Sequence, residues 1–513
     1  MKISVIIIHW NNRELLEQQL VLLSSGKELE LIVVDNASTE SLSSLTKKFS
    51  NVQFIQNTLN RGFAFACNQG RRVASGEWLL YLNPDVVIEA AQIKRMVEYA
   101  QVNHFAAVSP RFGSLDYQKP VPSWLSVLTE FSPLGKLIPL AGLGQRTLVG
   151  GCLLIQSQIL EEIHGWDERF FLWFEDSDLS ARLIDSGYTY GFIDDESIQH
   201  LGGTSFSQLG DQEKRDIFFH SLQMYADKHF SSFGKSFVNI ISRRYTKKRL
   251  LVSDQNVSAS IVVPNMKCEL LEDFLKKNIK FFIFNCQELI IVTSCENYES
   301  LRTTYPEVIF IYQAKNRGFA HTVNVGLHRA RGRVLGTIND DVLLNSQWLT
   351  RIENEFSHTQ DIGSVTPIVR KVDGTVESFG VNVLPFGRAD VKTDVQTSTE
   401  SATFNAAAVV FSREALEHVG LFDEGFESYL EDIDLGMRLN RNGWRNVAIS
   451  TSEITHFGQQ TSRSLNAHKN WLDVKNWWLV MLKNYSFSHW LTNLGPILLE
   501  RARNFSGYLK ALN

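Results

Sequence analysis

The sequence predicts an open α/β fold that is built twice along one chain of 513 residues. Two observations carry this prediction. Short continuous apolar runs alternate with helix-like stretches, a pattern typical of a mostly parallel sheet covered by helices on both faces. In addition, a shift of 256 residues superposes the chain's unusual polar positions on one another. A period this long indicates a duplicated domain, because solenoid repeats are only about 20–50 residues long.

The elements of each copy follow from runs of Ile, Val and Leu that stop at polar turns. In the first copy we expect strands at 4–8, 29–34, 52–56 and 77–82, with helices at 13–23 and 63–75. In the second copy the matching strands are expected at 260–264, 288–292 and 333–338. The order strand, helix, strand predicts parallel strands joined by crossover helices.

Composition excludes several functional classes. The net charge of −5 and the pI of about 6.3 give no sign of nucleic-acid binding. Five scattered cysteines without a C-x-x-C pair favour reduced thiols in a cytosolic compartment over a zinc site or a disulfide framework. We expect no signal peptide and no transmembrane helix, because the start of the chain is strand-like and long uncharged apolar runs are absent.

Polar turns follow two expected strands, where open α/β sheets bind their ligands. Asp35 follows one of these strands, and Asn83-Pro84-Asp85 follows the other. A carboxylate in this place can hold a hard divalent cation that also binds a diphosphate. A turn cap is the alternative interpretation. Recurrence of the turn as Asn339-Asp340-Asp341 favours the metal.

Two histidines occupy matching positions late in each copy. His200 lies 115 residues after Asp85, and His456 lies at the same spacing after Asp341. A single histidine is more often structural. A matched pair indicates a second metal ligand or a contact to a diphosphate.

An acidic cluster opens a helix in each copy, around Asp176 and Asp432. Capping of the helix N-terminus accounts for one or two acids. It does not account for three acids in four residues twice over, because close like charges repel. Such clusters raise the pKa of one member and can produce a general base.

A glycine precedes an expected helix in each copy, so that the backbone there can approach a phosphate or a ribose. The alternative interpretation is an ordinary helix-entry turn. The two matching strings are Asn60-Arg61-Gly62-Phe63-Ala64 and Asn316-Arg317-Gly318-Phe319-Ala320.

In combination and in this order, the motifs resemble a family 2 glycosyltransferase of the GT-A fold. The Asn-Pro-Asp version is similar to that of bacterial rhamnosyltransferases that build O-antigen and other surface polysaccharides. The resemblance covers residues 1–230 and again 258–485. The motifs of the first copy that carry it are Val33-Val34-Asp35-Asn36, Asn60-Arg61-Gly62-Phe63-Ala64, Leu82-Asn83-Pro84-Asp85, Glu175-Asp176 and His200.

The resemblance implies a role for each of these residues. Asp35 would contact the nucleobase or the ribose, and Asp85 with His200 would hold Mg²⁺ or Mn²⁺ on the diphosphate. Asp176 would deprotonate the acceptor hydroxyl in an inverting transfer. Two departures matter: Asn83 replaces the first acid of the family's Asp-x-Asp, and Thr293 stands at the position of Asp35 in the second copy.

The predicted organisation is two tandem GT-A domains at 1–242 and 258–485, a basic linker at 243–257 and an amphipathic tail at 486–513. The resemblance implies a bifunctional enzyme at the inner face of the cytoplasmic membrane. Its partners would be a nucleotide-sugar donor such as dTDP-L-rhamnose, a lipid-linked oligosaccharide acceptor, the membrane surface and other polysaccharide-assembly enzymes.

Three alternatives stay open. The first is a different donor, a UDP-hexose or a UDP-N-acetylhexosamine. The second is a non-catalytic second copy that binds glycan or acts as a scaffold. The third is a nucleotidyltransferase, which would need a basic, glycine-rich triphosphate loop that residues 9–13 do not supply.

Overall fold

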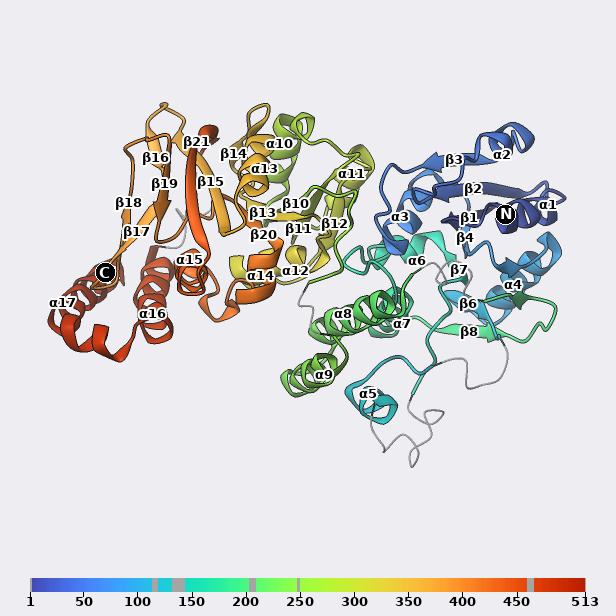
Figure 1. Ribbon diagram of the computed structural model, residues 1–513. Helices are drawn as coiled ribbons and strands as arrows, with labels where there is room; N and C mark the ends of the chain where they lie inside the picture. The colour runs from blue at the N-terminus through green and yellow to red at the C-terminus, as the bar shows by residue number, and fades with distance from the viewer. Residues whose placement is uncertain are drawn as a thin grey trace. The chain divides into compact units, whose positions relative to one another are not determined.

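The computed structural model describes residues 2–112, 119–131, 144–202, 209–246, 250–458 and 466–512. The chain divides into two compact units, Met1–Val252 and Ser253–Asn513 (Figure 1). Of the expected basic linker, residues 247–249 lie outside the described residues.

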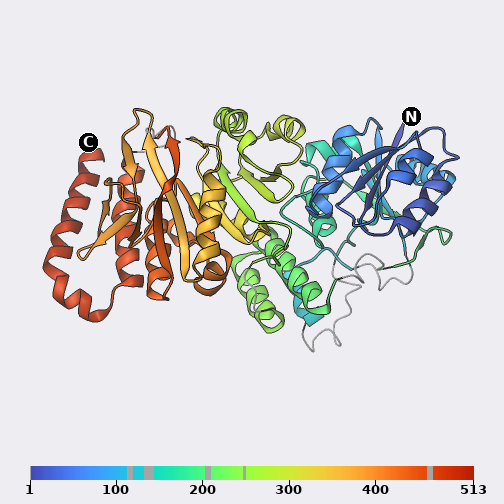
Figure 2. The ribbon, with the colours of Figure 1, turned by 45° about the horizontal axis from the view of Figure 1, so that its top comes forward.

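The first unit is built around one twisted sheet with helices on both faces (Figures 1 and 2). Its strands are β1 (Ile3–His9), β2 (Leu29–Asp35), β3 (Gln53–Gln56), β4 (Trp78–Leu82), β5 (Val86–Val87), β6 (Ala107–Pro110), β7 (Cys152–Gln156), β8 (Tyr190–Ile193) and β9 (Gln199–His200). Its helices are α1 (Arg13–Leu23), α2 (Ser43–Lys48), α3 (Phe63–Val73), α4 (Ala90–Val102), α5 (Trp124–Phe131), α6 (Ser157–Glu162), α7 (Glu175–Asp185), α8 (Asp211–His229) and α9 (Ser232–Tyr245).

Alternation of side chains along β1 explains both cores of this unit, because successive residues of a strand point to opposite faces. Val5 and Ile7 pack with Leu16 of α1 on one face. Ile6 and Ile8 pack with α3 and α7 on the other. The sheet order is β3-β2-β1-β4-β7-β6-β8. The expected α/β fold with parallel strands at its centre is confirmed, since β3, β2, β1 and β4 run parallel. Beyond it, β7 pairs antiparallel with both β4 and β6.

The second unit repeats this plan and adds short strands. Its strands are β10 (Ala259–Asn265), β11 (Gln287–Thr293), β12 (Ile309–Tyr312), β13 (Val334–Ile338), β14 (Val342–Leu343), β15 (Ile362–Lys371), β16 (Val376–Ser378), β17 (Val381–Leu384), β18 (Arg388–Val391), β19 (Ser398–Ser401), β20 (Ala408–Ser412) and β21 (Arg445–His456). Its helices are α10 (Cys268–Asn278), α11 (Tyr298–Thr304), α12 (Phe319–Arg329), α13 (Trp348–His358), α14 (Arg413–Val419), α15 (Glu431–Arg441), α16 (Asn466–Asn484) and α17 (Phe487–Leu512), with 3₁₀ turns η5 (Ile279–Phe281) and η6 (Glu424–Phe426).

The central strands of the second unit are again parallel, in the order β12-β11-β10-β13. The sheet then continues through β20, β15 and β21. Strand β16 extends it beside β15, β19 extends it beside β21, and β17 pairs with β18 in a separate hairpin. The second sheet is therefore larger and more antiparallel than the first.

One expectation about the cysteines is wrong. Cys268 and Cys295 form a disulfide, with their Cα atoms 5.2 Å apart, while Cys67, Cys152 and Cys286 are free. The pairing arises because β10 and β11 are parallel neighbours, so the loops that follow them meet at one edge of the sheet. The cysteine argument for a reducing compartment no longer holds. Among the described residues, no helix has both the length and the apolarity of a membrane span.

Candidate active site

In the first unit, a short antiparallel pairing brings His200 to Asp85. Strand β5 begins directly after Asp85, and its Val86 pairs with His200 of β9. The backbone N–H of Leu201 donates to the carbonyl oxygen of Asp85 at 2.8 Å, which fixes the register. His200 Nε2 then lies 3.5 Å from Asp85 Oδ1. Residues 115 positions apart are thereby held at one point beyond the sheet.

The second unit builds the same pair from equivalent strands. Val342 of β14 pairs with His456 of β21, and the N–H of Phe457 donates to the carbonyl of Asp341 at 2.9 Å. His456 Nε2 lies 3.2 Å from Asp341 Oδ1, and its Nδ1 lies 3.0 Å from Glu377. Burial lowers the pKa of His456, but its hydrogen bonds and its attraction to these two carboxylates outweigh burial and raise the pKa to about 10.

These residues fit a divalent cation shared with a phosphate ligand. Asp85 Oδ1 and Asp341 Oδ1 are buried, and the imidazole Nε2 of His200 or His456 is the described group that faces each of them. A buried carboxylate oxygen whose hydrogen-bonding capacity is not filled favours a cation as its ligand. Within the described ranges, no group of three or more His, Cys, Asp or Glu could hold an ion alone. Mg²⁺ is commonly held by one or two carboxylates together with substrate phosphates, which agrees with this donor set.

The acid-bearing helices begin after two residues with left-handed backbone angles in both units. Trp173 and Phe174 have φ of 65° and 67° before α7, and Tyr429 and Leu430 have φ of 69° and 67° before α15. Such angles are strained for large side chains and are maintained only where the surroundings impose them. The backbone conformation of these residues sets the direction in which each helix begins. The first turn of each helix, with its acids, lies at the carboxyl end of the sheet.

Burial gives Asp176 the character of a base. Its carboxylate accepts from the N–H of Ser177 at 2.7 Å and from the N–H of Gly150 at 3.4 Å. Burial raises its pKa more than these hydrogen bonds lower it. Burial and the charge of Asp176 raise the pKa of neighbouring Glu175 well above its usual range. The two carboxyl groups therefore titrate as a coupled pair, and the larger upward shift of pKa falls on Glu175.

Asp432 repeats this environment. Burial raises its pKa to about 6 despite hydrogen bonds from the backbone of Ile433 and Ala406. Burial and the charge of Asp432 raise the pKa of Glu431 in the same way.

The third acid of the first cluster has a structural role. Asp178 is buried, but Lys228, Arg182 and His229 outweigh burial and hold its pKa well below its usual value. Lys228 Nζ lies 2.6 Å and Arg182 Nε 2.7 Å from its carboxylate. These contacts tie α7 to α8 and exclude Asp178 as the base.

Gly150 and Gly151 place Asp176 beside the Asn83 turn. A Cβ on Gly150 would lie 3.3 Å from Asp176 Cβ, and a Cβ on Gly151 would lie 3.0 Å from Asn83 Nδ2. The N–H of Asn83 donates to the carbonyl of Gly151 at 2.8 Å. Asp176 and the turn that carries Asp85 therefore flank the same two residues, at the same end of the sheet. In the second unit, the N–H of Asn339 donates to Ala407 at 3.0 Å.

The Asn-Arg-Gly turns enter their helices through a glycine that no other residue could replace. Gly62 has φ of 91°, and a Cβ there would lie 2.5 Å from the carbonyl oxygen of Phe171. Asn60 Oδ1 accepts from Gly62 N at 2.9 Å, so this amide holds the turn. Arg61 is buried beside Phe65.

The matching turn of the second unit shares only part of this arrangement. Gly318 has φ of 96°, and Asn316 Oδ1 accepts from its N–H at 2.8 Å. Arg317, in contrast to the buried arginine of the first unit, is exposed.

The carboxyl ends of the first two strands differ most between the units. Asp35 pairs in register with His9 at the end of β1, and Thr293 pairs in register with Asn265. Asp35 accepts from the N–H of Ser38 at 3.1 Å. His9 was not predicted as a site residue. It is fully buried, and its two ring nitrogens make no hydrogen bond to the described residues.

In the second unit, Asn265 occupies the position that corresponds to His9 and makes different contacts. It donates to Asp340 Oδ2 at 2.7 Å and accepts from Thr293 Oγ1 at 2.8 Å. Burial raises the pKa of Asp340 to about 6, although the hydrogen bond from Asn265 opposes the shift.

Comparison with known families matches both units. The model "Glycosyl transferase family 2" matches residues 4–163, and "Glycosyltransferase like family 2" matches residues 259–472. The chain belongs to glycosyltransferase family 2, in two tandem copies. A third model, "N-terminal domain of galactosyltransferase", matches residues 142–202, which include Gly150 and Asp176.

Curated relatives have the same kind of name. An uncharacterized glycosyltransferase of Rickettsia conorii is 25% identical over 57% of this chain and 46% of its own length. A low-salt glycan biosynthesis hexosyltransferase of Haloferax volcanii is 25% identical over 49% of this chain and 82% of its own. An N-acetylglucosaminyl-diphospho-decaprenol L-rhamnosyltransferase of Mycobacterium tuberculosis is 24% identical over 40% of this chain and 78% of its own. The chain spans about half the length of the first curated relatives it matches.

Proposed function

We propose that each unit of this family 2 glycosyltransferase carries one transfer site, so that the chain is a bifunctional inverting enzyme. The observation that carries the proposal is the repetition of one arrangement. In each unit an aspartate with a buried carboxylate oxygen faces a histidine, and a second, half-buried aspartate with a raised pKa opens a helix at the same end of the sheet.

Asp176 would act as the general base in the first site. Its carboxylate accepts the proton of the acceptor hydroxyl while that oxygen bonds to the anomeric carbon and the bond to the diphosphate breaks. A raised pKa suits this task, because proton transfer is most efficient when the pKa of the base approaches the working pH. The hydrogen bonds from Gly150 and Ser177 orient the carboxylate. Asp432 would do the same in the second site.

Asp85 with His200, and Asp341 with His456, would hold a divalent cation, Mg²⁺ or Mn²⁺, on the donor diphosphate. Such a cation neutralises the charge that develops on the departing nucleoside diphosphate. The turns at Gly62 and Gly318 would border the donor, although each glycine is required by a contact within the chain, to the carbonyl of Phe171 or of Glu427. Asn83 would contribute an amide in place of a carboxylate.

The donor proposed for the first site is dTDP-L-rhamnose and the acceptor a lipid-linked oligosaccharide, in O-antigen or other surface polysaccharide synthesis. The name of the mycobacterial relative supports both, since it combines L-rhamnosyl transfer with a decaprenol-linked acceptor. We place the reaction at the inner face of the cytoplasmic membrane, together with other polysaccharide-assembly enzymes. Because the disulfide removes the cysteine argument, this location rests on the family resemblance.

A different donor for the second site is the second candidate. Thr293 replaces Asp35, and its hydroxyl is engaged with Asn265 and with the N–H of Cys295. A site that lacks the carboxylate would read another nucleoside. The name of the Haloferax volcanii relative, a hexosyltransferase, supports a hexose as a transferred sugar. We propose a UDP-hexose or a UDP-N-acetylhexosamine as the donor of the second site.

Product analysis decides between these proposals. The purified chain is incubated with a lipid-linked acceptor and a panel of dTDP- and UDP-sugars, with Mg²⁺, with Mn²⁺ or with EDTA. We expect transfer of rhamnose that stops in EDTA, and a second sugar added by the second site. Transfer from UDP-sugars alone would overturn the rhamnose proposal, and a single linkage made by one unit would overturn bifunctionality.

A further inference from the structure

We infer that helix α17 and its counterpart α9 dock on an anionic lipid surface. The inference rests on the proposed function, because it names the surface on which a lipid-linked acceptor would be met. The two helices are equivalents. Each follows a long helix that contacts the third acid of the cluster, through Lys228 to Asp178 in the first unit and through Asn484 to Asp434 in the second.

Helix α17 has one face packed and one face bare. Ile497 and Arg501 are buried, and the Arg501 guanidinium lies 5.1 Å from the ring centre of Trp477 on α16. The bare face carries large apolar side chains at steps of three, four and seven residues, of which the most exposed is Phe487 at 78%. The exposed apolar residues on this face are Phe487, Leu491, Leu494, Leu498, Phe505 and Leu509.

Helix α9 repeats the arrangement in the first unit. Val238 and Ile241 are buried with residues of α5 and α8. Phe233 and Ile240, on the outer side, are 69% and 65% exposed. Contiguous apolar exposure of this kind is uncommon on soluble monomers and marks an interaction surface. Its presence on the same element of both copies argues against an accident of one unit.

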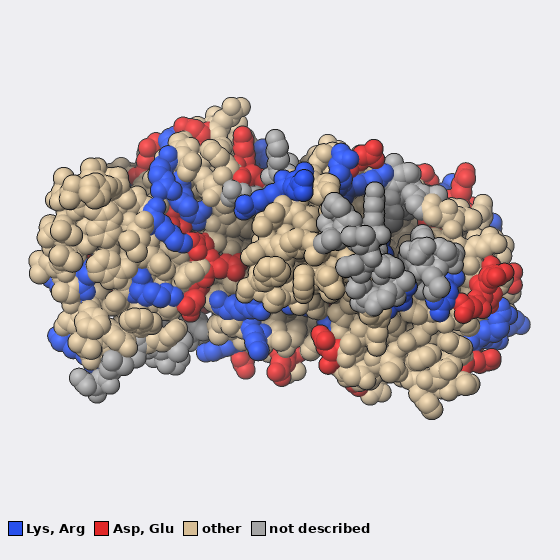
Figure 3. All heavy atoms as spheres, turned by 90° about the horizontal axis from the view of Figure 1, so that it is seen from below, with Lys and Arg blue, Asp and Glu red and all other residues tan. Residues whose placement is uncertain are grey.

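Charge identifies the surface that these helices fit. Helix α9 carries Lys235, Arg243 and Arg244 and no acid, while α17 carries Arg501, Arg503 and Lys510 against Glu500 alone. Because Arg501 is buried, five basic side chains that reach the surface stand against one acid, in a chain whose net charge is −5. Figure 3 shows the end of the second unit that carries α16 and α17 as mostly tan, with patches of blue.

An apolar stripe with a basic flank is typical of helices that lie in the headgroup region of an anionic bilayer. A second copy of the chain fits less well, because pairing α17 with α17, or α9 with α9, would bring like charges together. An anionic lipid surface satisfies both the apolar and the charged residues of these helices.

Vesicle sedimentation with the full chain tests the inference. The probes are vesicles of phosphatidylcholine alone and vesicles with about one third phosphatidylglycerol. The α17 variant combines Leu491→Glu with Leu498→Glu, and the α9 variant combines Phe233→Glu with Ile240→Glu. Val102→Glu in the first unit and Val372→Glu in the second are matched controls, since both are exposed apolar residues on other elements. A charge variant, Arg243→Gln with Arg244→Gln, separates electrostatic from apolar attraction.

We expect the unaltered chain to bind the anionic vesicles at least about tenfold more tightly than the neutral ones. Each helix variant should weaken binding about tenfold or more, while the control variants bind as the unaltered chain does. The charge variant should lower binding to anionic vesicles only, and added salt should do the same. Melting curves that match the unaltered chain show that the variants fold.

Two results would overturn the inference. One is equal sedimentation of the unaltered chain with and without vesicles. The other is light scattering that shows a dimer which the α17 or α9 variant converts to monomers, while vesicle binding is unchanged. The measurement uses no donor and no acceptor, so a failure of the proposed transferase activity would leave its outcome intact.

Discussion

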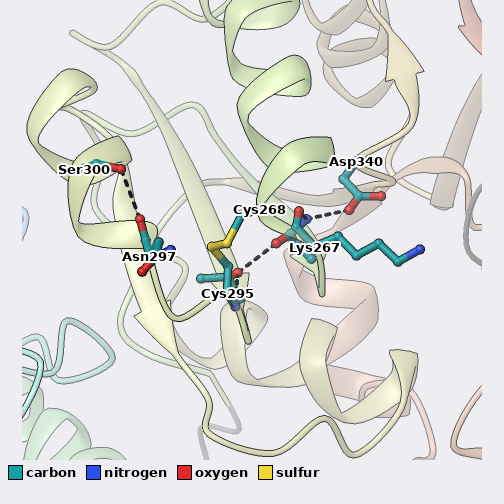
Figure 4. Close-up of a disulfide and its surroundings, with 8 residues drawn as sticks. Lys267, Cys268, Cys295, Asn297, Ser300 and Asp340 are labelled. Atoms are coloured by element: carbon teal, nitrogen blue, oxygen red, sulfur yellow. Dashed lines mark hydrogen bonds between the residues drawn. A yellow bond between two sulfur atoms is a disulfide. The ribbon is translucent and has the colours of Figure 1, made fainter.

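The two units tie together the same pair of loops with different bonds. In the first unit, the loops after β1 and β2 are joined by hydrogen bonds of Asn11, whose N–H donates to Ser38 Oγ at 2.9 Å and whose Oδ1 accepts from Thr39 N at 2.8 Å. In the second unit, the loops after β10 and β11 are joined by the Cys268–Cys295 disulfide (Figure 4). Both pairs of loops lie next to the position proposed for the nucleobase, and the two units join them with different kinds of bond.

The residues that we propose to act in catalysis, in contrast, are alike in the two units. Asp176 and Asp432 share partial burial, a glutamate neighbour whose pKa is raised, and backbone donors. His200 and His456 share a carboxylate and a strand pairing. Divergence is concentrated where the nucleoside would lie, at His9 and Asp35 against Asn265 and Thr293. This distribution agrees with the proposal of one reaction with two donors.

The largest expected effect comes from Asp176→Asn and Asp432→Asn made separately. Each amide keeps the shape of the site but cannot take a proton. We expect a loss of about 10²–10⁴-fold in the linkage made by the altered unit and an unchanged rate for the other. Mass spectrometry of the products measures each linkage. The exposed Asp185→Asn and Asp390→Asn serve as controls. If the Asp432 variant still forms every linkage, the second unit is not catalytic.

Loss of the disulfide is the next largest effect. Cys268 and Cys295 are 27 residues apart in sequence, and closing a loop of that size stabilises the native state by about 3–4 kcal/mol in the chain-entropy model. We expect Cys268→Ser, or reduction by a dithiol, to lower the free energy of unfolding of the second unit alone.

Hydrogen exchange of peptides that cover β10 and β11 measures this change, with peptides of β1 and β2 as the internal reference. Cys286→Ser, which removes a free thiol, is the matched control. Equal loss of protection in both units would contradict a disulfide that stabilises only the second unit.

A smaller effect follows from pH. The pKa of Asp432 is about 6, so this base becomes protonated below pH 6. The linkage made by the second unit should slow about tenfold per pH unit there, because only the ionised form accepts a proton. The pKa is higher than the ordinary value of about 3.9. Between these values the folded state binds more protons than the unfolded state, so stability falls as pH rises through the window.

Rate–pH profiles of the two linkages and melting temperatures at pH 5 and pH 7 measure both consequences. Asp432→Asn should remove this contribution to the pH dependence of stability. A second linkage whose rate is flat from pH 7 to pH 5 would exclude Asp432 as the base.

The sequence predicted the central strands well, because continuous apolar runs have few other solutions. The helix expected at 13–23 is α1, and the strand expected at 77–82 is β4. Strands β17, β18 and β19 could not be predicted in the same way, since they are short and only partly buried. Their pairing depends on neighbours distant in sequence rather than on local hydrophobicity.

The residues of the proposed site likewise fall into those that could be predicted from the sequence and those that could not. Its paired residues were found because both copies retain them. His9 was missed because the second copy has Asn265 at that position, so comparison of the copies gives no signal. Glu377 was missed for a similar reason, since it sits on β16, which has no counterpart among the described strands of the first unit. Only the arrangement of neighbouring strands could have shown that the loops bearing Cys268 and Cys295 meet.

The smallest expected effect concerns Asn11 in the first unit. Its φ is 53°, in the left-handed region that asparagine tolerates better than alanine. Asn11→Ala removes the side-chain bonds to Thr39 and adds backbone strain, for a total of about 2 kcal/mol. Asn11→Gly removes the bonds without the strain and should cost about 1 kcal/mol. Denaturant unfolding, resolved by hydrogen exchange over β1 and β2, measures the difference. Equal losses would mean that the hydrogen bonds alone close these loops, whereas no loss in the glycine variant would mean that they do not hold them.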